Sequence, residues 1–597
     1  MAKGNIAVHT ENIFPVIKQW LYSDKDIFAR ELVSNGCDAI SKRKKLVLDG
    51  EAKAPEKFEI KVTVDKPNKK LIFSDNGLGM TAEEIEKYIT QVAFSGAEDF
   101  LSKYKDDKTT SIIGHFGLGF YSAFMVGDTV EIESLSYKDG AKPAKWSCDG
   151  GTEYETGEGS RTEVGTDIIL NVGKDNEEFL DYSRISGILY KYCYFLPVDI
   201  YVINAEDEKS GDKPFNDKEP LWLKKPSECT EEEYKEFYTK VFMDMDAPLF
   251  WIHLNVDFPF NLKGIIYFPK LKHEASGLEG QIKLYNNQVF VADNIKEVIP
   301  EYLMMLRGCI DCPDLPLNVS RSFLQNDGYV KKVSAHIIKK VCDKLTGMFN
   351  TERETLEKYW DDISPFVKYG SMRDESFYEK VKDIVMLKTT KGEYKTVTEY
   401  LEGADEKHKN IIYYATNTDV QAQYIDMYEQ DGVEVVTFPL AIDTHFMSFC
   451  EFKNRDIRFK RVDSEITSGT ETDKEVAEKL TKLFKDSIGD DKLIVECRDL
   501  KTTDLPAIIN MSEEARRLNE MSILMGGNMP EIPDEKKLIV NTGCAITASL
   551  SASEDEEYNK LVCNYIYDLA SLAHAPLTSE QMKAFLERSA KILERIK

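Results

Sequence analysis

The sequence predicts a multidomain α/β protein, and three observations lead to this fold class. The chain has 597 residues, which is more than a single hydrophobic core usually supports. Hydrophobic residues make up 42% of it, enough to bury several cores. Over residues 1–204, segments with helical periodicity alternate with segments of period two, which predicts one α/β sandwich domain.

Two polar stretches divide the rest of the chain. Residues 205–220, "AEDEKSGDKPFNDKEP", contain Phe215 as their only large apolar residue and predict a short charged linker, with a polar surface loop as the alternative. A second polar stretch near 463–475 predicts another boundary. The expected parts are therefore the first domain at 1–204, the linker at 205–220, an α/β middle domain at 221–470 and an α+β C-terminal domain at 471–597.

Individual elements are predicted from periodicity and capping patterns. Alternating apolar and polar residues predict strands, and apolar residues at helical spacing predict helices. Thr230, followed three residues later by Glu233, has the capping-box pattern that opens a helix. The expected strands include 58–65, 70–77, 128–137, 250–258 and 264–271, and the expected helices include 12–23, 81–94 and 334–349.

Two amphipathic helices are predicted at the C-terminal end. Such apolar stripes need a cover, which is either the rest of the same domain or a second copy of the chain, and the pattern leaves both open. The first stripe consists of Leu561, Tyr565, Ile566, Leu569, Leu572 and Ala573. After a Thr578–Gln581 capping box, the second consists of Met582, Phe585, Leu586, Ile592, Leu593 and Ile596.

Composition argues against several classes of partner. The chain has 77 Lys and Arg against 104 Asp and Glu, a net charge of −27 that disfavours nucleic acid as a partner. The sequence contains no run of about 18 apolar residues that would predict a membrane span, and its first residues lack a signal-peptide pattern. The eleven cysteines are scattered, which favours reduced thiols and a cytoplasmic protein. Cys309 and Cys312 form a lone CxxC, which is weak evidence for a metal site.

A row of polar residues stands out in "RELVSNGCDA", residues 30–39. On a helix, Glu31, Asn35 and Asp38 lie within roughly 60° of one another, opposite Leu32 and Val33. A solvated outer face is the simplest interpretation of such a row. The alternative is that the row faces a ligand.

Two glycine-containing segments favour the ligand. In "LIFSDNGLGM", residues 71–80, Asp75 follows a predicted strand; Gly79 and Met80 suit close approach to a flat ligand, although Asp-Asn-Gly is also a common hairpin turn. "GHFGLGF", residues 114–120, precedes a helical segment, and free backbone N–H groups before a helix suit phosphate oxygens. Each signal alone is weak.

In combination the signals identify a family. A helix with Glu-x-x-x-Asn-x-x-Asp, then Asp-x-Gly-x-Gly, then Gly-x-x-Gly-x-Gly resembles the ATP-binding fold of gyrase, histidine kinases and MutL. Beyond this order, the chain closely resembles the heat-shock protein 90 family of molecular chaperones, bacterial branch, over essentially its whole length. The segments that carry the resemblance are "LYSDKDIFARELVSNGCDAISK" (21–42), "GHFGLGFYSAFMV" (114–126), "DLPLNVSRSFLQND" (314–327) and "TTDLPA" (502–507), together with the ending "LERIK" without an acidic tail.

The resemblance implies a role for each matching residue. Glu31 would be the general base for the attacking water, and Asn35 would hold the Mg²⁺ that bridges the phosphates of ATP. Asp38 and Ala39 would line the same pocket. Asp75 would accept a hydrogen bond from the adenine amino group, supported by Thr166, with Gly79 and Met80 against the base.

Phosphate contacts would come from a glycine loop and a distant arginine. The resemblance assigns backbone N–H donors to the segment that contains Gly114, Phe116, Gly117 and Gly119, with Phe120 in the pocket wall. Arg321 would reach the γ-phosphate from the middle domain, helped by Asn318 and Gln325. One departure is Phe94, which stands where family members commonly have a lid lysine.

The function implied is an ATP-driven chaperone that forms a homodimer through its C-terminal domain and remodels non-native client proteins, with other chaperones as further partners. Met511–Met529 is a candidate client segment, with an amphipathic core helix as the alternative. A DNA-repair or topoisomerase ATPase would share the pocket, but the charge of −27 opposes it. A sensor kinase would need a phosphoacceptor helix, and a nucleotide-binding holdase would not need Glu31 and Arg321.

Overall fold

The computed structural model divides the chain into two compact units, residues 1–344 and 345–597. The domain limits predicted from the sequence stay predictions, and the helix predicted at 12–23 lies outside the described residues. The structure describes residues 24–91, 113–114, 117–151, 153–207, 209–270, 281–296, 298–315, 317, 328–406, 408–464, 470–490, 493–500, 505–513, 517, 537–574 and 577–595.

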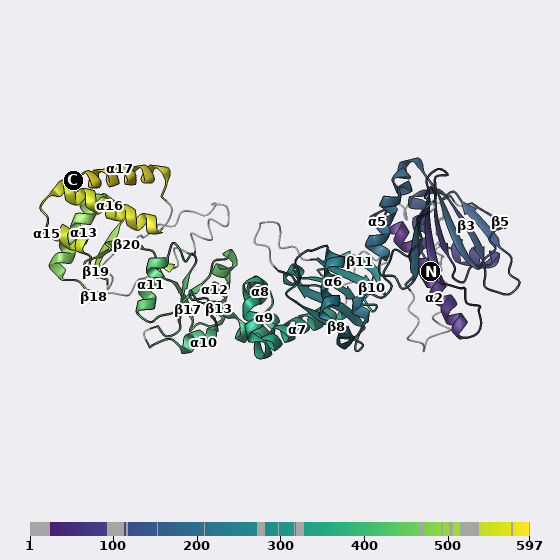
Figure 1. Ribbon diagram of the computed structural model, residues 1–597, viewed down its shortest axis with the longest axis horizontal. Helices are drawn as coiled ribbons and strands as arrows, with labels where there is room; N and C mark the ends of the chain where they lie inside the picture. Colours follow the sequence, from purple (N-terminus) through teal and green to yellow (C-terminus); the bar gives the residue numbers. More distant parts are fainter. Residues whose placement is uncertain are drawn as a thin grey trace, which may run out of the picture. The chain divides into compact units, whose positions relative to one another are not determined.

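A seven-stranded sheet forms the first part of unit 1 (Figure 1). Its order is β5-β4-β3-β6-β2-β1-β7; β1 and β7 are parallel, and the other neighbours are antiparallel. Every second residue of β1 and β2 is buried, so this sheet has one face on a core, as the period-two pattern predicts. The strands are β1 (Glu59–Asp65), β2 (Lys70–Asp75), β3 (Gly127–Leu135), β4 (Ala144–Cys148), β5 (Tyr154–Glu158), β6 (Gly165–Val172) and β7 (Asp199–Asn204).

Helices cover the buried face of this sheet. Helix α2 (Ile27–Leu48) packs on it through Phe28, whose ring meets the edges of Phe73 in β2 and Phe179 at centroid distances of 6.0 and 5.3 Å. The predicted α/β sandwich is confirmed, including the strands at 58–65, 70–77 and 128–137. The other helices of this layer are α3 (Ala82–Ile89), η3 (Gly119–Met125), η4 (Lys174–Leu180) and α5 (Tyr182–Cys193).

The segment predicted as a linker is hydrogen-bonded to the first sheet. The Asn216 side chain accepts from the N–H of Ile200 at 2.9 Å and donates to the carbonyls of Leu196 and Val198 at 2.9 and 2.8 Å. Phe215 packs against the core of unit 1. These bonds hold residues 215–217 against β7; the linker role itself stays a prediction.

A second, five-stranded sheet completes unit 1. Its order is β11-β10-β12-β9-β8, and α6 begins with the predicted capping box, since Thr230 accepts from the N–H of Glu233 and the Glu233 side chain accepts in return. Its elements are α6 (Glu231–Phe242), β8 (Phe250–Val256), β9 (Leu262–Phe268), β10 (Gln281–Asn286), β11 (Val289–Asp293), η7 (Glu301–Met305) and β12 (Arg307–Asp311); α7 (Gly328–Thr351) follows.

Unit 2 begins with helices around a small parallel sheet of order β16-β15-β17. A buried ion pair joins two of its helices, Lys368 Nζ to Asp443 Oδ1 at 2.5 Å. The elements are α8 (Arg353–Arg373), α9 (Glu375–Val381), η8 (Lys382–Ile384), β13 (Met386–Lys388), β14 (Tyr394–Thr396), α10 (Val397–Glu402), β15 (Ile411–Ala415), α11 (Ala422–Gln430), β16 (Val435–Thr437), α12 (Ala441–Lys453) and β17 (Arg458–Arg461).

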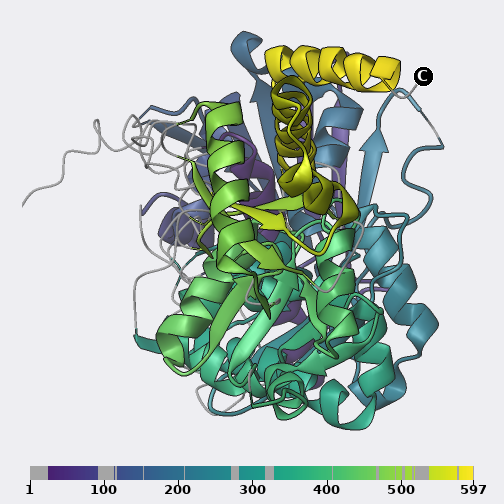
Figure 2. The ribbon, with the colours of Figure 1, turned by 90° about the vertical axis from the view of Figure 1, so that its left-hand side faces the viewer.

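The C-terminal part of unit 2 packs helices on a four-stranded sheet of order β18-β19-β21-β20. Figure 2 shows the last two helices, in yellow, with α17 crossing the end of α16. The elements are β18 (Thr470–Glu471), α13 (Lys474–Ile488), β19 (Ile494–Asp499), β20 (Ala507–Asn510), β21 (Lys537–Asn541), α15 (Ala545–Ala552), α16 (Glu556–His574) and α17 (Ser579–Arg595).

The apolar stripe predicted for α16 faces α17, and a different side of the helix faces the domain core. Of the predicted residues only Ile566 is buried, and the helix buries Val562, Cys563 and Ala570 instead. The physical reason is that α16 has two apolar sides, because it packs on α13 and β20 and also on α17. The predicted side meets α17, where Tyr565 stacks on Phe585 at 5.4 Å. The Thr578–Gln581 capping box is confirmed.

All eleven cysteines lie among the described residues, and none of them forms a disulfide. Within the described ranges, no helix combines the length and the apolar character needed to cross a membrane.

Candidate functional site

The polar row of α2 is buried for the most part. Glu31 is 4% exposed and Asp38 is 7% exposed, while Asn35 is half-buried. Carboxylates are rarely buried without a partner, because burial removes their hydration. A solvated outer face therefore does not describe Glu31 or Asp38, and each of them has identifiable contacts.

Asp38 holds the start of the glycine-containing segment. Its two carboxylate oxygens accept hydrogen bonds of 2.7 Å each from the backbone N–H groups of Ile113 and Gly114. A Cβ atom added at Gly114 would lie 3.1 Å from Asp38 Oδ2 and 3.6 Å from Asn35 Oδ1. The segment thus passes directly over the second half of the row, and the Gly114 N–H is engaged by Asp38.

Glu31 lies between an arginine and a glycine. Arg30 donates to Glu31 Oε1 from Nε at 3.0 Å and from a terminal guanidinium nitrogen at 2.8 Å, and its guanidinium also lies over the ring of Tyr192, 5.7 Å from the centroid. On the other side, a Cβ atom at Gly119 would come within 2.6 Å of Glu31 Oε2. A side chain at residue 119 would force the Glu31 carboxylate to move, so the end of the segment passes closely over the first part of the row.

Asp75 lies at the end of β2, next to α2. In the sheet register it is opposite Thr166 of β6, and its Oδ1 accepts a 2.7 Å hydrogen bond from the N–H of Gly77. A Cβ atom at Gly36 of α2 would lie 3.2 Å from the Asp75 Cβ, and one at Gly77 would lie 2.5 Å from the Ala39 Cβ. The turn after β2 therefore packs against α2 at Gly36 and Ala39.

Burial changes the chemistry of Asp75. The carboxyl is 9% exposed, and the loss of solvation raises its pKa to about 7; the Gly77 N–H opposes this rise. Asp75 can therefore exchange a proton near neutral pH, and its ionised form is a strong acceptor for an N–H donor.

Ser134 organises the residues beside Asp75. Its hydroxyl accepts from the N–H of Met80 at 2.8 Å, donates to the carbonyl of Gly165 at 3.1 Å and lies 2.9 Å from the Thr166 hydroxyl. Gly79 has φ of +63°, and a Cβ atom there would lie 1.9 Å from the Leu135 carbonyl oxygen. Glycine is thus required at this position both for its conformation and for space.

Phe120 anchors η3 in the core. It is 7% exposed, and its ring meets those of Tyr121, Phe124 and Trp146 at 5.6, 6.2 and 5.8 Å. Gly117, just before η3, has φ of +64°. This aromatic cluster fixes the start of η3, and with it the backbone that passes Glu31.

Several predicted residues lie outside the described parts of the chain. These are Phe94, Phe116, Asn318, Arg321, Gln325 and most of the segment 511–529. The residues that the structure brings together are Glu31, Asn35, Asp38, Ala39, Asp75, Gly79, Met80, Gly114, Gly119 and Thr166, with Gly117 and Phe120 adjoining.

Sequence reasoning missed the buried arginines and Ser134. The Arg43 guanidinium donates to the carbonyls of Asn76 at 2.7 Å and Lys53 at 3.0 Å, so it ties α2 to the turn after Asp75. Arg161 donates to the Asp75 carbonyl at 2.9 Å. Arg43 is a basic residue on the apolar side of an otherwise amphipathic helix, and this position could have indicated its structural role. No feature of the sequence indicated the role of Ser134.

The arrangement places several side-chain oxygens close together. Within the described ranges, no group of three or more His, Cys, Asp or Glu side chains forms a metal cage. Mg²⁺ bound with a nucleotide usually takes only one or two protein oxygens and completes its shell with phosphates and water, so the oxygens of Asn35 and the neighbouring carboxylates fit such an ion.

Comparisons with known proteins cover nearly the whole chain. The family described as "Hsp90 protein" matches residues 205–596, and that described as "Histidine kinase-, DNA gyrase B-, and HSP90-like ATPase" matches residues 28–153. "Chaperone protein HtpG" of Bacteroides thetaiotaomicron is 44% identical over 91% of this chain and 83% of its own length. The proteins of that name from Bacteroides fragilis and Porphyromonas gingivalis are 43% and 42% identical, each over 93% of this chain and 85% of its own length.

Proposed function

The chain belongs to the Hsp90 family and is an ATP-dependent molecular chaperone with an ATPase domain of the gyrase and histidine-kinase type, and from this premise we propose how its residues use ATP. The observation that carries the proposal is the burial of Glu31 and Asp38 beneath the backbone of Ile113, Gly114 and Gly119. Buried carboxylates that face a glycine-rich segment are suited to a polar ligand that replaces water.

The adenine end of ATP is assigned to Asp75. Its carboxylate would accept the hydrogen bond of the adenine amino group, and Thr166 supports this position from the neighbouring strand. Met80, fixed through Ser134, and Ala39 would pack on the base, with Gly79 giving room for the turn.

The phosphate end is assigned to the segment at 114–120. Backbone N–H groups from Gly117 to Phe120 would contact the phosphates, and Asn35 would hold Mg²⁺, which neutralises phosphate charge when bound. Phe116 belongs to the same segment, and Gly114 contributes through its contact with Asp38. Arg321, with Asn318 and Gln325, would add positive charge at the γ-phosphate.

Hydrolysis is assigned to Glu31. Its carboxylate would take a proton from the attacking water, and Arg30 holds it in one orientation through two hydrogen bonds. Phosphoryl transfer depends mainly on such positioning and on charge neutralisation. Turnover to ADP and phosphate would drive a clamp cycle in which the chaperone remodels non-native client proteins in the cytoplasm, with other chaperones as partners.

The clamp would be a homodimer formed through α16 and α17. None of the residues of α17 is buried, and Leu586 and Leu593 are 59% and 66% exposed. Leucines in one stripe on a terminal helix are typical of a surface covered by a second copy of the chain.

The test separates hydrolysis from binding. Glu31→Gln keeps an acceptor for Arg30 but removes the base, so steady-state phosphate release should fall by about a hundredfold or more. ATP affinity, measured by calorimetry, should change by less than about threefold. Glu31→Ala should give the same loss of turnover, and Glu155→Ala, an exposed glutamate on β5, should leave turnover unchanged. Turnover near the wild-type rate in Glu31→Gln would remove Glu31 from the mechanism.

A further inference from the structure

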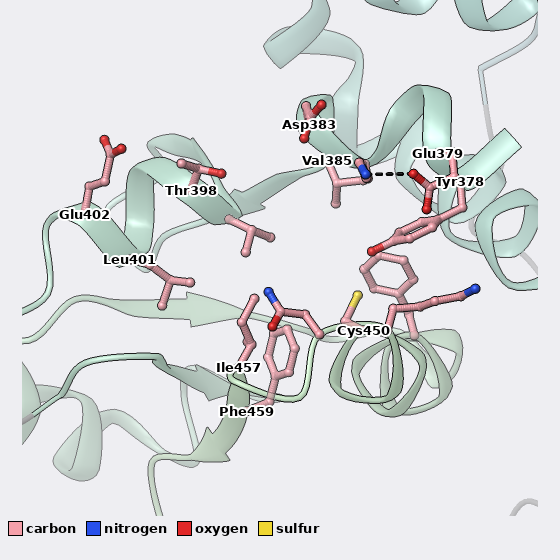
Figure 3. A pocket seen from close by; sticks show the side chains of 15 residues that line it. Tyr378, Glu379, Asp383, Val385, Thr398, Leu401, Glu402, Cys450, Ile457 and Phe459 are labelled. Atoms are coloured by element: carbon pink, nitrogen blue, oxygen red, sulfur yellow. Dashed lines mark hydrogen bonds and ion pairs between the residues drawn. The ribbon is translucent and has the colours of Figure 1, made fainter. Parts of the chain in front are cut away.

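A cavity of about 550 Å³ lies in unit 2, in a different unit from the ATP site (Figure 3). It opens between α9 with η8, α10, and α12 with the start of β17. Its volume is in the range of sites that hold a small ligand or a few side chains. None of the residues assigned to ATP or to the dimer lines it.

The floor of the cavity is apolar and comes from separate elements. Val385, Phe446, Ile457 and Phe459 are buried there, and Ile457 and Phe459 belong to the hydrophobic core around β15. Val397 and Leu401 of α10 and Cys450 of α12 are only half-buried against the same core. Figure 3 shows Leu401, Ile457, Phe459 and Cys450 arranged around one common space. The cavity therefore leaves apolar surface of a core accessible from outside.

Cys450 contributes to this floor as an apolar group. Burial raises the pKa of its thiol to about 12, so the thiol is neutral at physiological pH. A neutral, half-buried thiol packs like a small hydrophobic side chain and is a poor nucleophile.

The rim carries charge, and its cations already have partners. Lys382 pairs with Glu379 at 2.7 Å, and Lys453 pairs with Glu375. Among the described residues, neither Asp383 nor Glu402 forms an ion pair or hydrogen bond with a side chain. In Figure 3, the side chains of Asp383 and Glu402 extend from η8 and α10 away from the centre of the cavity, so both belong to its rim.

We propose that this cavity binds a large apolar side chain of a non-native client segment that carries basic residues on both sides of it. The inference rests on the proposed client-remodelling function and assigns one of its binding sites. The apolar floor takes the side chain, and the carboxylates of Asp383 and Glu402 attract the flanking Lys or Arg. Because these carboxylates come from different elements, η8 and the end of α10, their cations must be separated along the ligand, which suits an extended chain.

Electrostatics outside the cavity favour the same class of ligand. The chain has a net charge of −27, which raises the rate at which basic segments encounter it. The long stems of Lys and Arg can also lie on Leu401 and Val397 while their charged ends reach the rim. An acidic segment would meet the carboxylates of Asp383 and Glu402, while the rim cations Lys382 and Lys453 are already paired with Glu379 and Glu375.

The test uses the full chain without nucleotide and a fluorescent, unstructured synthetic peptide with a Trp-Leu pair between two arginines. Binding is followed by anisotropy at low salt, and a second peptide has glutamates in place of the arginines. In Asp383→Lys/Glu402→Lys, both positions are exposed, so the fold should tolerate the change. The arginine peptide should bind this variant about fivefold more weakly, and the glutamate peptide should bind it more tightly than it binds wild type.

The matched control is Glu478→Lys/Asp486→Lys, which makes the same charge change at exposed positions of α13. It should bind the arginine peptide within about twofold of wild type at physiological salt. Leu401→Asp, which alters the floor of the cavity, should weaken binding of the arginine peptide even though the variant gains a negative charge. Equal binding of the arginine peptide to wild type and to Asp383→Lys/Glu402→Lys would overturn the proposal, as would equal loss in the control.

This outcome is independent of ATP chemistry. The peptide measurement contains no nucleotide, so it stands even if Glu31→Gln were to hydrolyse ATP normally. Conversely, failure of the peptide prediction leaves the turnover result for Glu31 intact.

Discussion

Helices α2 and α17 lie in different units and differ in which side chains they bury. Helix α2 buries Arg30, Glu31 and Asp38 together with its apolar residues, so charge is enclosed on a helix that could have faced water. Helix α17 buries none of its residues and leaves Leu586 and Leu593 exposed.

The two helices carry different costs in free energy. Burying a carboxylate costs solvation free energy, which hydrogen bonds from Arg30 and from the N–H groups of Ile113 and Gly114 offset. Exposing leucines forgoes the free energy of burial, which a second copy of the chain would recover. We therefore propose a ligand site at the enclosed charges of α2 and a partner at the uncovered apolar surface of α17.

The largest effect is expected at α17. Leu586→Glu/Leu593→Glu places four charges at the interface of a dimer, and each leucine lost removes about 1.5–3 kcal/mol of burial. The dissociation constant of the dimer should rise by about a thousandfold or more. Sedimentation equilibrium measures it directly.

A matched variant tests whether the added negative charge alone would dissociate the dimer. Lys583→Ala/Lys591→Ala changes the net charge of α17 by the same amount at exposed positions beside the stripe. It should remain dimeric at the concentrations that dissociate the leucine variant. A dimer unaffected by the leucine changes would mean that α17 is not its interface.

A smaller effect concerns the pH dependence of ATP binding through Asp75. The pKa of this carboxyl is about 7, so it is mostly protonated at pH 6 and mostly ionised at pH 8. The ionised form accepts the adenine amino hydrogen more strongly than the neutral carboxyl does, so ATP affinity should rise by up to about tenfold from pH 6 to pH 8. Calorimetric titrations across this range measure the change.

Asp75→Asn separates this carboxyl from the titration of ATP itself. Asparagine keeps an acceptor oxygen but has no proton to lose in this range, so the part of the pH dependence due to residue 75 should vanish. An identical pH profile in wild type and Asp75→Asn would contradict the assignment of Asp75 to the adenine.

The smallest effect is expected at Ser134. Ser134→Ala removes the acceptor for the Met80 N–H and the contact to the Thr166 hydroxyl. Met80 and Thr166 should then be held less firmly beside Asp75, and ATP affinity should fall about threefold. Ser136→Ala is the control, because that buried serine hydroxyl has no hydrogen-bond partner among the described residues. A loss of affinity equal in both variants would show that Ser134 has no special role.

Most of the residues that the structure brings together around α2 could be predicted from the sequence, and the reasons are local. Glu31, Asn35 and Asp38 share a face because helix geometry fixes their spacing, and Asp75 ends a strand with clear alternation. Ser134 could not be predicted, since its role depends on the register that sets β3 beside β6. The pattern left open what covers the predicted stripe of α16, because periodicity identifies an apolar face and not its neighbour; in the structure Tyr565 of this stripe stacks on Phe585 of α17.

We propose above all that the enclosed polar row of α2 faces a nucleotide. A crystal structure of the Glu31→Gln variant with ATP and Mg²⁺ tests it most directly, because the variant should hold ATP without consuming it. We expect the adenine amino group within hydrogen-bond distance of Asp75, the metal ion at Asn35, and the phosphates along residues 117–120. ATP bound elsewhere on the chain, with the side chains of α2 unchanged and in contact only with protein, would contradict it.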